Sequence, residues 1–561
     1  MLSLTTTRDG LAARRTTASW LAPLCLALAA GLLYSINLGR LPQPDELHHA
    51  IAARGLLAHG IPSIAEGQYD RVLLHSWMVA GAYALFGDSL AVARLPSVLC
   101  MAVLVGLMFV WLRREAGSLA AWLGTGLFAL SPFAVDTAQF ARFYAPQCLS
   151  LFVAAVLIHA AVLEREDLRR RLLLGGLSLP PLLLAIYFQP TTLIGMAGIG
   201  LWVAGALVLP WLGDPAVPLR RKLVLTLGSL GLGLALIAAV WLSGAVDELW
   251  HRYRWTPLFN RGTQDQFWFY HAWFSLLYPS LWPLTGILGL VAIVHRPRPA
   301  AFALTVFAMA FLLNSIAAAK SLRYIVYAQP FLFSVWGIAL AALWTPLGSF
   351  LAGLRASLSD RLADLGRPFR PVSWLLLGGA ILFLVMGNPT WLRTTALLAD
   401  ITIPPEVPMA DWPRAKPALE PWLATADVVV TTEELASLYY LGRYDLRFSR
   451  SKLEELPDAE QKEFGIDPRT GRPVISTQAS MERVFACYPK GIILGPDSTW
   501  NNPTLIDGDL AELIRQRARP LALPPGSHMF AYVWEQPSGD PATADCAALP
   551  RLVQSPSAAK G

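Results

Sequence analysis

Titratable residues gather at five places beside the apolar runs of this sequence. The first is PDELHH (44–49), in which Asp45 and Glu46 directly follow the first apolar run. The second is YDRVLLHSW (69–77), which contains Arg71 and His75. The other three are SPFAVDTAQFARFYAPQ (131–147) with Asp136, Arg142 and Tyr144, the arginine-rich loop 244–271, and AAAKSLRYIVYAQP (317–330) with Lys320, Arg323 and Tyr324. Charged groups at membrane depth are costly and usually mark a function.

These residue types suit the transfer of a sugar from a lipid phosphate. A carboxylate can remove a proton from an attacking hydroxyl or amine. Arginine and lysine can hold a phosphate and stabilise its charge as it leaves. Cleavage of the sugar–phosphate bond of the lipid donor would supply the free energy for transfer, so no ATP site is needed. The sequence has none of the Gly-rich phosphate loops.

Each group, taken alone, also has a structural explanation. The Pro-Asp-Glu at 44–46 could cap a helix, since carboxylates suit helix N-termini. Arg142 could form an ion pair with Asp136, six residues away. Lys320 and Arg323 could be interfacial anchors whose charged ends reach the headgroups. The histidines could be ordinary interface residues or, less readily, a zinc site; no metal site is predicted.

The composition indicates the elements that must position these residues. Of the 561 residues, 55% are hydrophobic and only 15% are charged, with a mean hydropathy of +0.46; soluble proteins carry about 25% charged residues. Several apolar runs have the roughly 20 residues that cross a bilayer. The sequence therefore predicts a polytopic α-helical membrane protein, whose first run, 19–38, is an uncleaved span rather than a signal peptide.

Hydropathy predicts about 11 spans. Their expected limits are 18–38, 90–112, 118–137, 143–163, 172–188, 190–211, 223–243, 272–294, 300–318, 324–344 and 372–388. Basic residues precede the first span and fill the loops near 113, 164–171, 220–222, 295–298 and 355–370. An odd span count puts all of these loops on one side, which the positive-inside rule makes cytoplasmic. The net charge of +6 at pH 7 is thus a topology signal, and no nucleic-acid partner is expected.

Beyond residue 389 the apolar runs shorten and the charge rises. Strands are expected at 426–432, 491–496 and 529–535, and helices at 433–441 and 509–518, which together indicate a small extracytoplasmic α/β domain. The expected domains are therefore a helical domain at 1–388, an α/β domain at 389–540 and a disordered tail at 541–561. Cys487 and Cys546 lie where an oxidising compartment permits a disulfide, although their pairing stays open.

Four stretches, in this order, resemble the glycosyltransferase C superfamily. They are PDELHHAIAARGLLAHG (44–60), HSWMVAGAYALFGDSLAVARLPSVL (75–99), SPFAVDTAQFARFYAPQCLSLF (131–152) and KSLRYIVYAQPFL (320–332). The similarity is to the bacterial polyprenyl-phosphate-sugar transferases grouped with lipid A aminoarabinose transferase and protein O-mannosyltransferases. It covers roughly residues 18–345.

The resemblance implies roles for the residues that match its motifs. Asp45 matches an aspartate thought to act as catalytic base or to orient the acceptor, Glu46 is its neighbour in the same motif, and both are expected to be catalytic. Arg71 stands where relatives carry Lys or His before Pro-Pro; because Val72 and Leu73 replace those prolines, this loop is expected to follow a different path. The remaining expected substrate-binding residues are His75, Asp136, Arg142, Tyr144, Lys320, Arg323 and Tyr324, with the Lys320 and Arg323 pair near the lipid phosphate.

The resemblance also implies the reaction and its location. It implies an inverting glycosyltransferase in a bacterial inner membrane, which takes a sugar from a polyprenyl-phosphate donor on the periplasmic face. The sugar is left open, as is the acceptor, which could be a lipid, a polysaccharide or a protein. No cofactor is required, although the carboxylates and histidines could bind a divalent metal. The alternatives are a transporter or flippase, which predicts interrupted spans and internal repeats, and a ligase that uses a diphosphate-linked donor.

Overall fold

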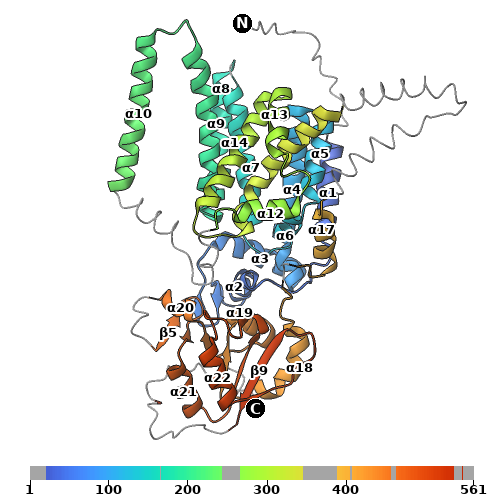
Figure 1. Cartoon of the computed structure of the whole chain (residues 1–561), viewed down its shortest axis with the longest axis vertical. Helices are drawn as coiled ribbons and strands as arrows, with labels where there is room; N and C mark the ends of the chain where they lie inside the picture. Colours follow the sequence, from blue (N-terminus) through green and yellow to red (C-terminus); the bar gives the residue numbers. More distant parts are fainter. Residues whose placement is uncertain are drawn as a thin grey trace, which may run out of the picture.

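The chain forms a body of apolar helices with a sheet domain at one end (Figure 1). The computed structural model describes residues 20–164, 166–242, 266–344, 388–404, 407–456, 463–535 and 546. Three predicted segments lie mostly outside these residues. They are the loop 244–271, the span 372–388 and the tail 541–561, of which residues 266–271, 388 and 546 are described. The polytopic helical class with a C-terminal α/β domain is confirmed.

Among the described residues, six helices are long and apolar enough to cross a membrane. They are α4 (Leu90–Ala116), α7 (Tyr144–Leu163), α8 (Leu168–Phe188), α9 (Thr192–Gly213), α14 (Pro297–Ile316) and the helix Val326–Trp344. A seventh is present if α5 (Ser118–Ala129) and α6 (Pro132–Ala138), which bend by 60°, form one broken span. The bend follows from Pro132, which lacks the N–H that would continue α5.

The six or seven spans found among the described residues are fewer than the 11 predicted for the whole chain. The first predicted span corresponds to α1 (Leu21–Tyr34), which has only 14 residues. The predicted span 272–294 is divided into α12 (Phe269–Leu277) and α13 (Thr285–His295). Pro279 and Pro283 lie between these two helices, and proline interrupts helical hydrogen bonding. The predicted span 223–243 corresponds to α10 (Leu219–Leu242), which is not one of the six helices named above.

The segment after α1 fills the space between the helical body and the sheet domain (Figure 1). It contains η2 (Pro44–Glu46), α2 (Leu47–His59), the hairpin of β1 (Ser63–Ile64) and β2 (Gly67–Gln68), and α3 (Leu73–Phe86). Leu47 and Tyr69 from this segment share one buried core with Leu435 and other sheet-domain residues. The hairpin is held to the domain by an ion pair of Glu66 with Arg472, at 2.7 Å.

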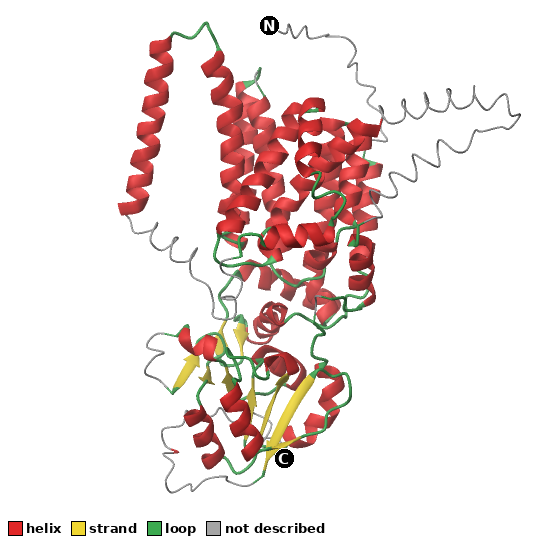
Figure 2. Cartoon of the chain, in the orientation of Figure 1, coloured by secondary structure: helices red, strands yellow, loops and turns green. Residues whose placement is uncertain are grey.

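The sheet domain contains seven strands in the order β5-β6-β4-β3-β7-β9-β8. Figure 2 shows helices packed around this sheet. β3, β4, β6 and β7 are parallel to their neighbours in this group, and β5, β8 and β9 add antiparallel edges. The strands are β3 (Val428–Thr431), β4 (Leu446–Phe448), β5 (Phe464–Asp467), β6 (Arg472–Ile475), β7 (Gly491–Pro496), β8 (Arg519–Pro520) and β9 (Met529–Trp534).

The helices of this domain and of the segment before it are short. They are α17 (Thr390–Ala399), α18 (Trp412–Leu423), α19 (Glu434–Ala436), α20 (Arg450–Glu454), α21 (Gln478–Cys487) and α22 (Gly508–Arg517). α17 belongs by packing to the helical body, because the Thr394 hydroxyl donates to the Leu130 carbonyl at 2.8 Å. The predicted domain limits of 1–388 and 389–540 stay a prediction, with α17 packed on the helical body.

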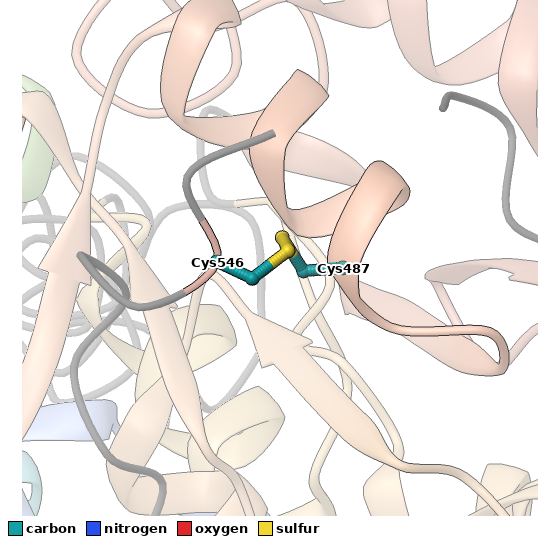
Figure 3. Close-up of a disulfide and its surroundings, with 2 residues drawn as sticks. All are labelled: Cys487 and Cys546. Atoms are coloured by element: carbon teal, nitrogen blue, oxygen red, sulfur yellow. A yellow bond between two sulfur atoms is a disulfide. The ribbon is translucent and has the colours of Figure 1, made fainter. Parts of the chain in front are cut away.

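A disulfide joins Cys487, the last residue of α21, to Cys546 (Figure 3). The pairing that the sequence left open is therefore present. The bond ties a residue beyond β9 back to the helix before β7, across a sequence separation of 59. Cys100 and Cys148 are free and buried in α4 and α7, as small apolar residues would be, whereas Cys25 is exposed.

Candidate active site

A cavity of about 770 Å³ lies between the helical body and the sheet domain, and both parts line it. Six of the ten predicted site residues line it: Asp45, Arg71, Arg142, Tyr144, Arg323 and Tyr324. Glu46, His75, Asp136 and Lys320 are not among the lining residues that the structure describes. The cavity is therefore built from segments that are almost 280 residues apart in the helical part alone.

Asp45 lies at the centre of the contacts on the membrane side. Pro44 starts the short η2 turn that holds it, since proline favours the first position of a helical turn. An Arg323 guanidinium N–H donates to Asp45 Oδ2 at 2.5 Å, and Arg142 donates to the Asp45 backbone carbonyl at 2.8 Å. Burial alone would raise the pKa of Asp45, but the charges of Arg142 and Arg323 outweigh it and hold that pKa well below its usual range.

Three arginines give this side of the cavity its positive charge. Arg142 lies 4.8 Å and Arg71 5.8 Å from the centre of the Phe143 ring, and Arg323 lies 5.9 Å from that of Tyr144. Stacking on aromatic rings holds a guanidinium in place while its N–H groups stay available to other acceptors. Guanidinium groups are suited to phosphate because they can donate two parallel hydrogen bonds.

The loop that carries Arg71 has a backbone conformation that a proline at position 72 could not adopt. Val72 has a φ of 54°, in the left-handed region. Proline is fixed near a φ of −65° and cannot adopt this conformation. The expectation of a different path from the absence of Pro-Pro agrees with this backbone geometry.

Glu46 is placed away from the cavity, in a buried ion pair. Its two carboxylate oxygens accept hydrogen bonds from Arg94 of α4, both at 2.8 Å, and the two side chains are 1% and 0% exposed. The same carboxylate accepts from the backbone N–H groups of Gln43 and Ala141. Both carboxylate oxygens of Glu46 are thus engaged in fixing the turn 43–46 against α4, while its expected catalytic role stays a prediction.

Two other predicted residues, Asp136 and Lys320, also have partners outside the cavity. Asp136 pairs with Arg40 at 3.0 Å, rather than with Arg142 as one structural alternative proposed. Lys320 is buried, and its ammonium donates to the carbonyls of Asn314, Ser315 and Ala317 at the end of α14. A lysine at this position satisfies carbonyls that the helix leaves without partners.

His75, on α3, is also buried rather than exposed to the cavity. Its ring packs edge-on against His49, with 4.7 Å between ring centres. In the described part of the chain, no three His, Cys, Asp or Glu side chains are grouped closely enough to hold a metal ion.

The sheet domain supplies lining residues that the sequence did not identify. They are Thr432, Glu433, Glu434, Leu435, Arg447, Ser449, Ser451, Lys452, Glu455, Arg469, Thr504 and Leu505. Arg469 links the two parts, because it contacts His48 Nε2 at 2.8 Å and also pairs with Glu434 and Asp467. The usable signal was the position of Thr432 at the end of the predicted strand 426–432 and of Glu433 just after it, where ligands of parallel sheets often bind.

The cavity and the basic loops lie at opposite ends of the membrane helices. α7 begins at the cavity with Tyr144, α8 ends just before Gln189, and α9 begins just after Thr191, all three being lining residues. α14 likewise ends near the lining residue Ala317. The far ends of these helices and of α4 carry or adjoin the basic stretches 113–114, 169–171, 220–222 and 296–298.

Comparison with known proteins agrees with this architecture. The sequence profile of the family described as dolichyl-phosphate-mannose-protein mannosyltransferase matches residues 70–241. The predicted resemblance to the glycosyltransferase C superfamily is confirmed. No curated protein matches the sequence.

Solved structures of membrane enzymes share the fold. ArnT from Cupriavidus metallidurans, bound to undecaprenyl phosphate, has a TM-score of 0.58 at 17% identity, over 92% of this chain and 98% of ArnT. The apo form of ArnT has a TM-score of 0.53 at 18% identity, over 91% of this chain and 97% of ArnT. The archaeal oligosaccharyltransferase AglB from Archaeoglobus fulgidus was solved in complex with an inhibitory peptide and a dolichol-phosphate. It has a TM-score of 0.53 at 12% identity, over 86% of this chain and 70% of AglB.

Proposed function

We propose that the chain is an integral-membrane glycosyltransferase that moves a sugar from a polyprenyl phosphate to an acceptor. One observation carries this proposal: Asp45 and the cationic groups Arg71, Arg142 and Arg323 share one cavity at a single end of the membrane helices. A lipid phosphate that reaches this end along the helices would meet three guanidinium groups. The family profile and the fold shared with ArnT support the same reaction class.

The three arginines would bind the phosphate and stabilise it as it departs. When the acceptor attacks the anomeric carbon, the bond from that carbon to the phosphate oxygen breaks, and negative charge grows on the phosphate. Preorganised cations aimed at the developing charge lower the barrier to such a step. Lys320 would act at a distance, by fixing the turn from α14 to the segment that carries Arg323.

Asp45 would hold Arg323 in position rather than act as the catalytic base, which is one of the two roles that the resemblance implies. Its carboxylate is held by Arg323, so it keeps that guanidinium directed into the cavity. Its low pKa also means that it stays ionised and binds a proton weakly.

The cavity would open on the periplasmic side of a bacterial inner membrane. Basic loops favour the cytoplasm, and these loops lie at the opposite end of the helices from the cavity. In this orientation the disulfide-bonded sheet domain would lie in the periplasm, and its disulfide supports this because disulfides persist in that oxidising compartment.

The test is the release of undecaprenyl phosphate from undecaprenyl-phosphate sugars by the purified full chain in nanodiscs, given an envelope extract as acceptor. We expect Arg323→Ala to reduce release about 100-fold or more, as loss of a transition-state donor does, and to weaken binding of radiolabelled undecaprenyl phosphate. Asp136→Asn is the matched control, because it removes an arginine-paired carboxylate outside the cavity. Donor movement across the bilayer without release of undecaprenyl phosphate would instead indicate a flippase and refute the proposal.

A further inference from the structure

The sheet domain contributes one half-buried carboxyl group to the cavity, that of Glu433. This residue follows the carboxyl end of β3, the central strand of the parallel group, by two positions. Although Glu433 precedes α19, its side chain makes no capping hydrogen bond. Its backbone N–H donates to the Thr431 hydroxyl at 3.1 Å, which stabilises the turn.

Glu433 differs from the other carboxyl groups that line the described cavity. Asp45 pairs with Arg323, Glu434 with Arg447 at 2.9 Å, and Glu455 with Lys452 at 3.0 Å. Asp70 is exposed to solvent. Among these five, Glu433 alone is both partly buried and without an ion pair within the part of the chain that the structure describes.

The surroundings of Glu433 make it a stronger base than Asp45. Burial, and then the charge of Glu434, raise the pKa of Glu433 to about 8, with a further contribution from Asp45 on the membrane side and an opposing one from Arg447. The arginines around Asp45 have the reverse effect on its pKa. A general base works best when its pKa is near the working pH, because it is then partly deprotonated and still binds a proton well.

We propose that Glu433 is the general base of the transfer and that the acceptor nucleophile is a hydroxyl group. This inference rests on the proposed glycosyltransferase function. The Glu433 carboxylate takes the proton of the acceptor hydroxyl while the hydroxyl oxygen forms its bond to the anomeric carbon. The electron pair of the broken carbon–oxygen bond stays on the polyprenyl phosphate, and the proton stays on Glu433 until solvent removes it.

The acceptor class follows from the need for a base. A hydroxyl must lose its proton during attack, whereas a phosphate acceptor is already an anion and needs no base. The two halves of the cavity would then divide the work: the arginines of the helical body hold the leaving phosphate, and the sheet domain receives the hydroxyl. Ser449, which lines the cavity at the end of β4, has a hydroxyl oxygen that accepts from the Lys452 N–H, so its proton can still be donated to the acceptor.

The rate should rise with pH, because the base acts in its deprotonated form. Three charged groups act on the titration of Glu433: Glu434 and Arg447 from the sheet domain, and Asp45 from η2. We expect kcat/KM of the full chain in nanodiscs, measured as release from undecaprenyl-phosphate mannose, glucose or 4-amino-arabinose with envelope extract, to rise up to about pH 8 and then level off.

Glu433→Gln should lower kcat about 100-fold or more, abolish the rise with pH and leave binding of undecaprenyl phosphate unchanged. Asp70→Asn, which alters the exposed carboxylate of the same cavity, should keep the rise. Infrared difference spectra provide a readout that does not depend on turnover: a protonated carboxyl band should disappear near pH 8 and be missing in Glu433→Gln.

The outcomes separate the two proposals. If the wild-type chain releases undecaprenyl phosphate from none of these donors, the proposed function fails and this inference fails with it. If wild-type release occurs and Glu433→Gln matches it at every pH, only the inference fails, and a phosphate acceptor or another base is indicated. Absence of the titrating infrared band from the wild-type chain would also overturn it.

Discussion

Replacing Glu46 by glutamine separates a structural role from a catalytic one. The change keeps the shape of the side chain but leaves the Arg94 guanidinium, which is 0% exposed, without its counter-charge. Arg94 would retain hydrogen bonds to the carbonyls of Leu38 and Arg40, at 2.6 and 2.9 Å. Breaking one side of a buried ion pair typically costs about 3–5 kcal/mol, because the remaining charge stays buried.

This cost can be converted into a shift in melting temperature. For one cooperative unit the size of the whole chain, the unfolding entropy typical of proteins gives a decrease of about 2–4 °C in Tm. The assay is thermal unfolding of the purified full chain, followed by tryptophan fluorescence. Lys416 and Glu420 form an exposed pair at 3.7 Å, so Glu420→Gln serves as the control and should change stability by less than about 0.5 kcal/mol.

A double substitution tests the ion pair itself. Glu46→Leu combined with Arg94→Leu should destabilise the chain by less than the sum of the two single changes, since neither charge is then buried alone. Unchanged melting of Glu46→Gln together with loss of sugar transfer would refute this reasoning and return Glu46 to the catalytic role expected from its motif.

Two further perturbations test how the sheet domain is held. Gly67→Ala places a methyl group 2.4 Å from the backbone of Arg469, so it should loosen the contact of the hairpin with the domain and increase proteolysis there; Gly81→Ala, which meets no atom within 4 Å, is the control. Cys487→Ser should destabilise the sheet domain by about 4 kcal/mol in the loop-entropy description, measured by denaturant unfolding with and without reductant, and sugar transfer at low temperature should persist because the bond lies outside the residues lining the cavity.

Local patterns in the sequence were sufficient for much of the secondary structure. The apolar segments around Val429, Ile493 and Ala531 become β3, β7 and β9, because a short buried run bounded by polar residues has few alternatives to a central strand. Hydropathy was less reliable for the spans, since it sums apolar residues without regard to breaks. The prolines at 279 and 283 contribute little to the sum yet divide one predicted span into two short helices.

The site was only partly predictable, because ion-pair partners are chosen in three dimensions. Lys320 and Arg323 are three residues apart and were expected to act together, but Lys320 turns back to the end of α14 while Arg323 reaches Asp45. Asp45 and Glu46 are adjacent and likewise diverge, one to the cavity and the other to Arg94. A motif thus identifies a segment, whereas the direction of each side chain depends on what the fold places around it.

The packing between the helical body and the sheet domain fixes the geometry of the cavity between them. Arg472 pairs with Glu66, Arg469 contacts His48, and Leu47 and Tyr69 share a core with the sheet domain. The first outer segment, which carries Asp45, is therefore part of the packing of the domain that carries Glu433. If the sheet domain shifted relative to Asp45, it would have to expose that shared core and break these ion pairs together. A substitution that loosens the contact, such as Gly67→Ala, should consequently lower transfer more than it lowers binding of undecaprenyl phosphate, because it separates the proposed base from the proposed phosphate site, which remains intact.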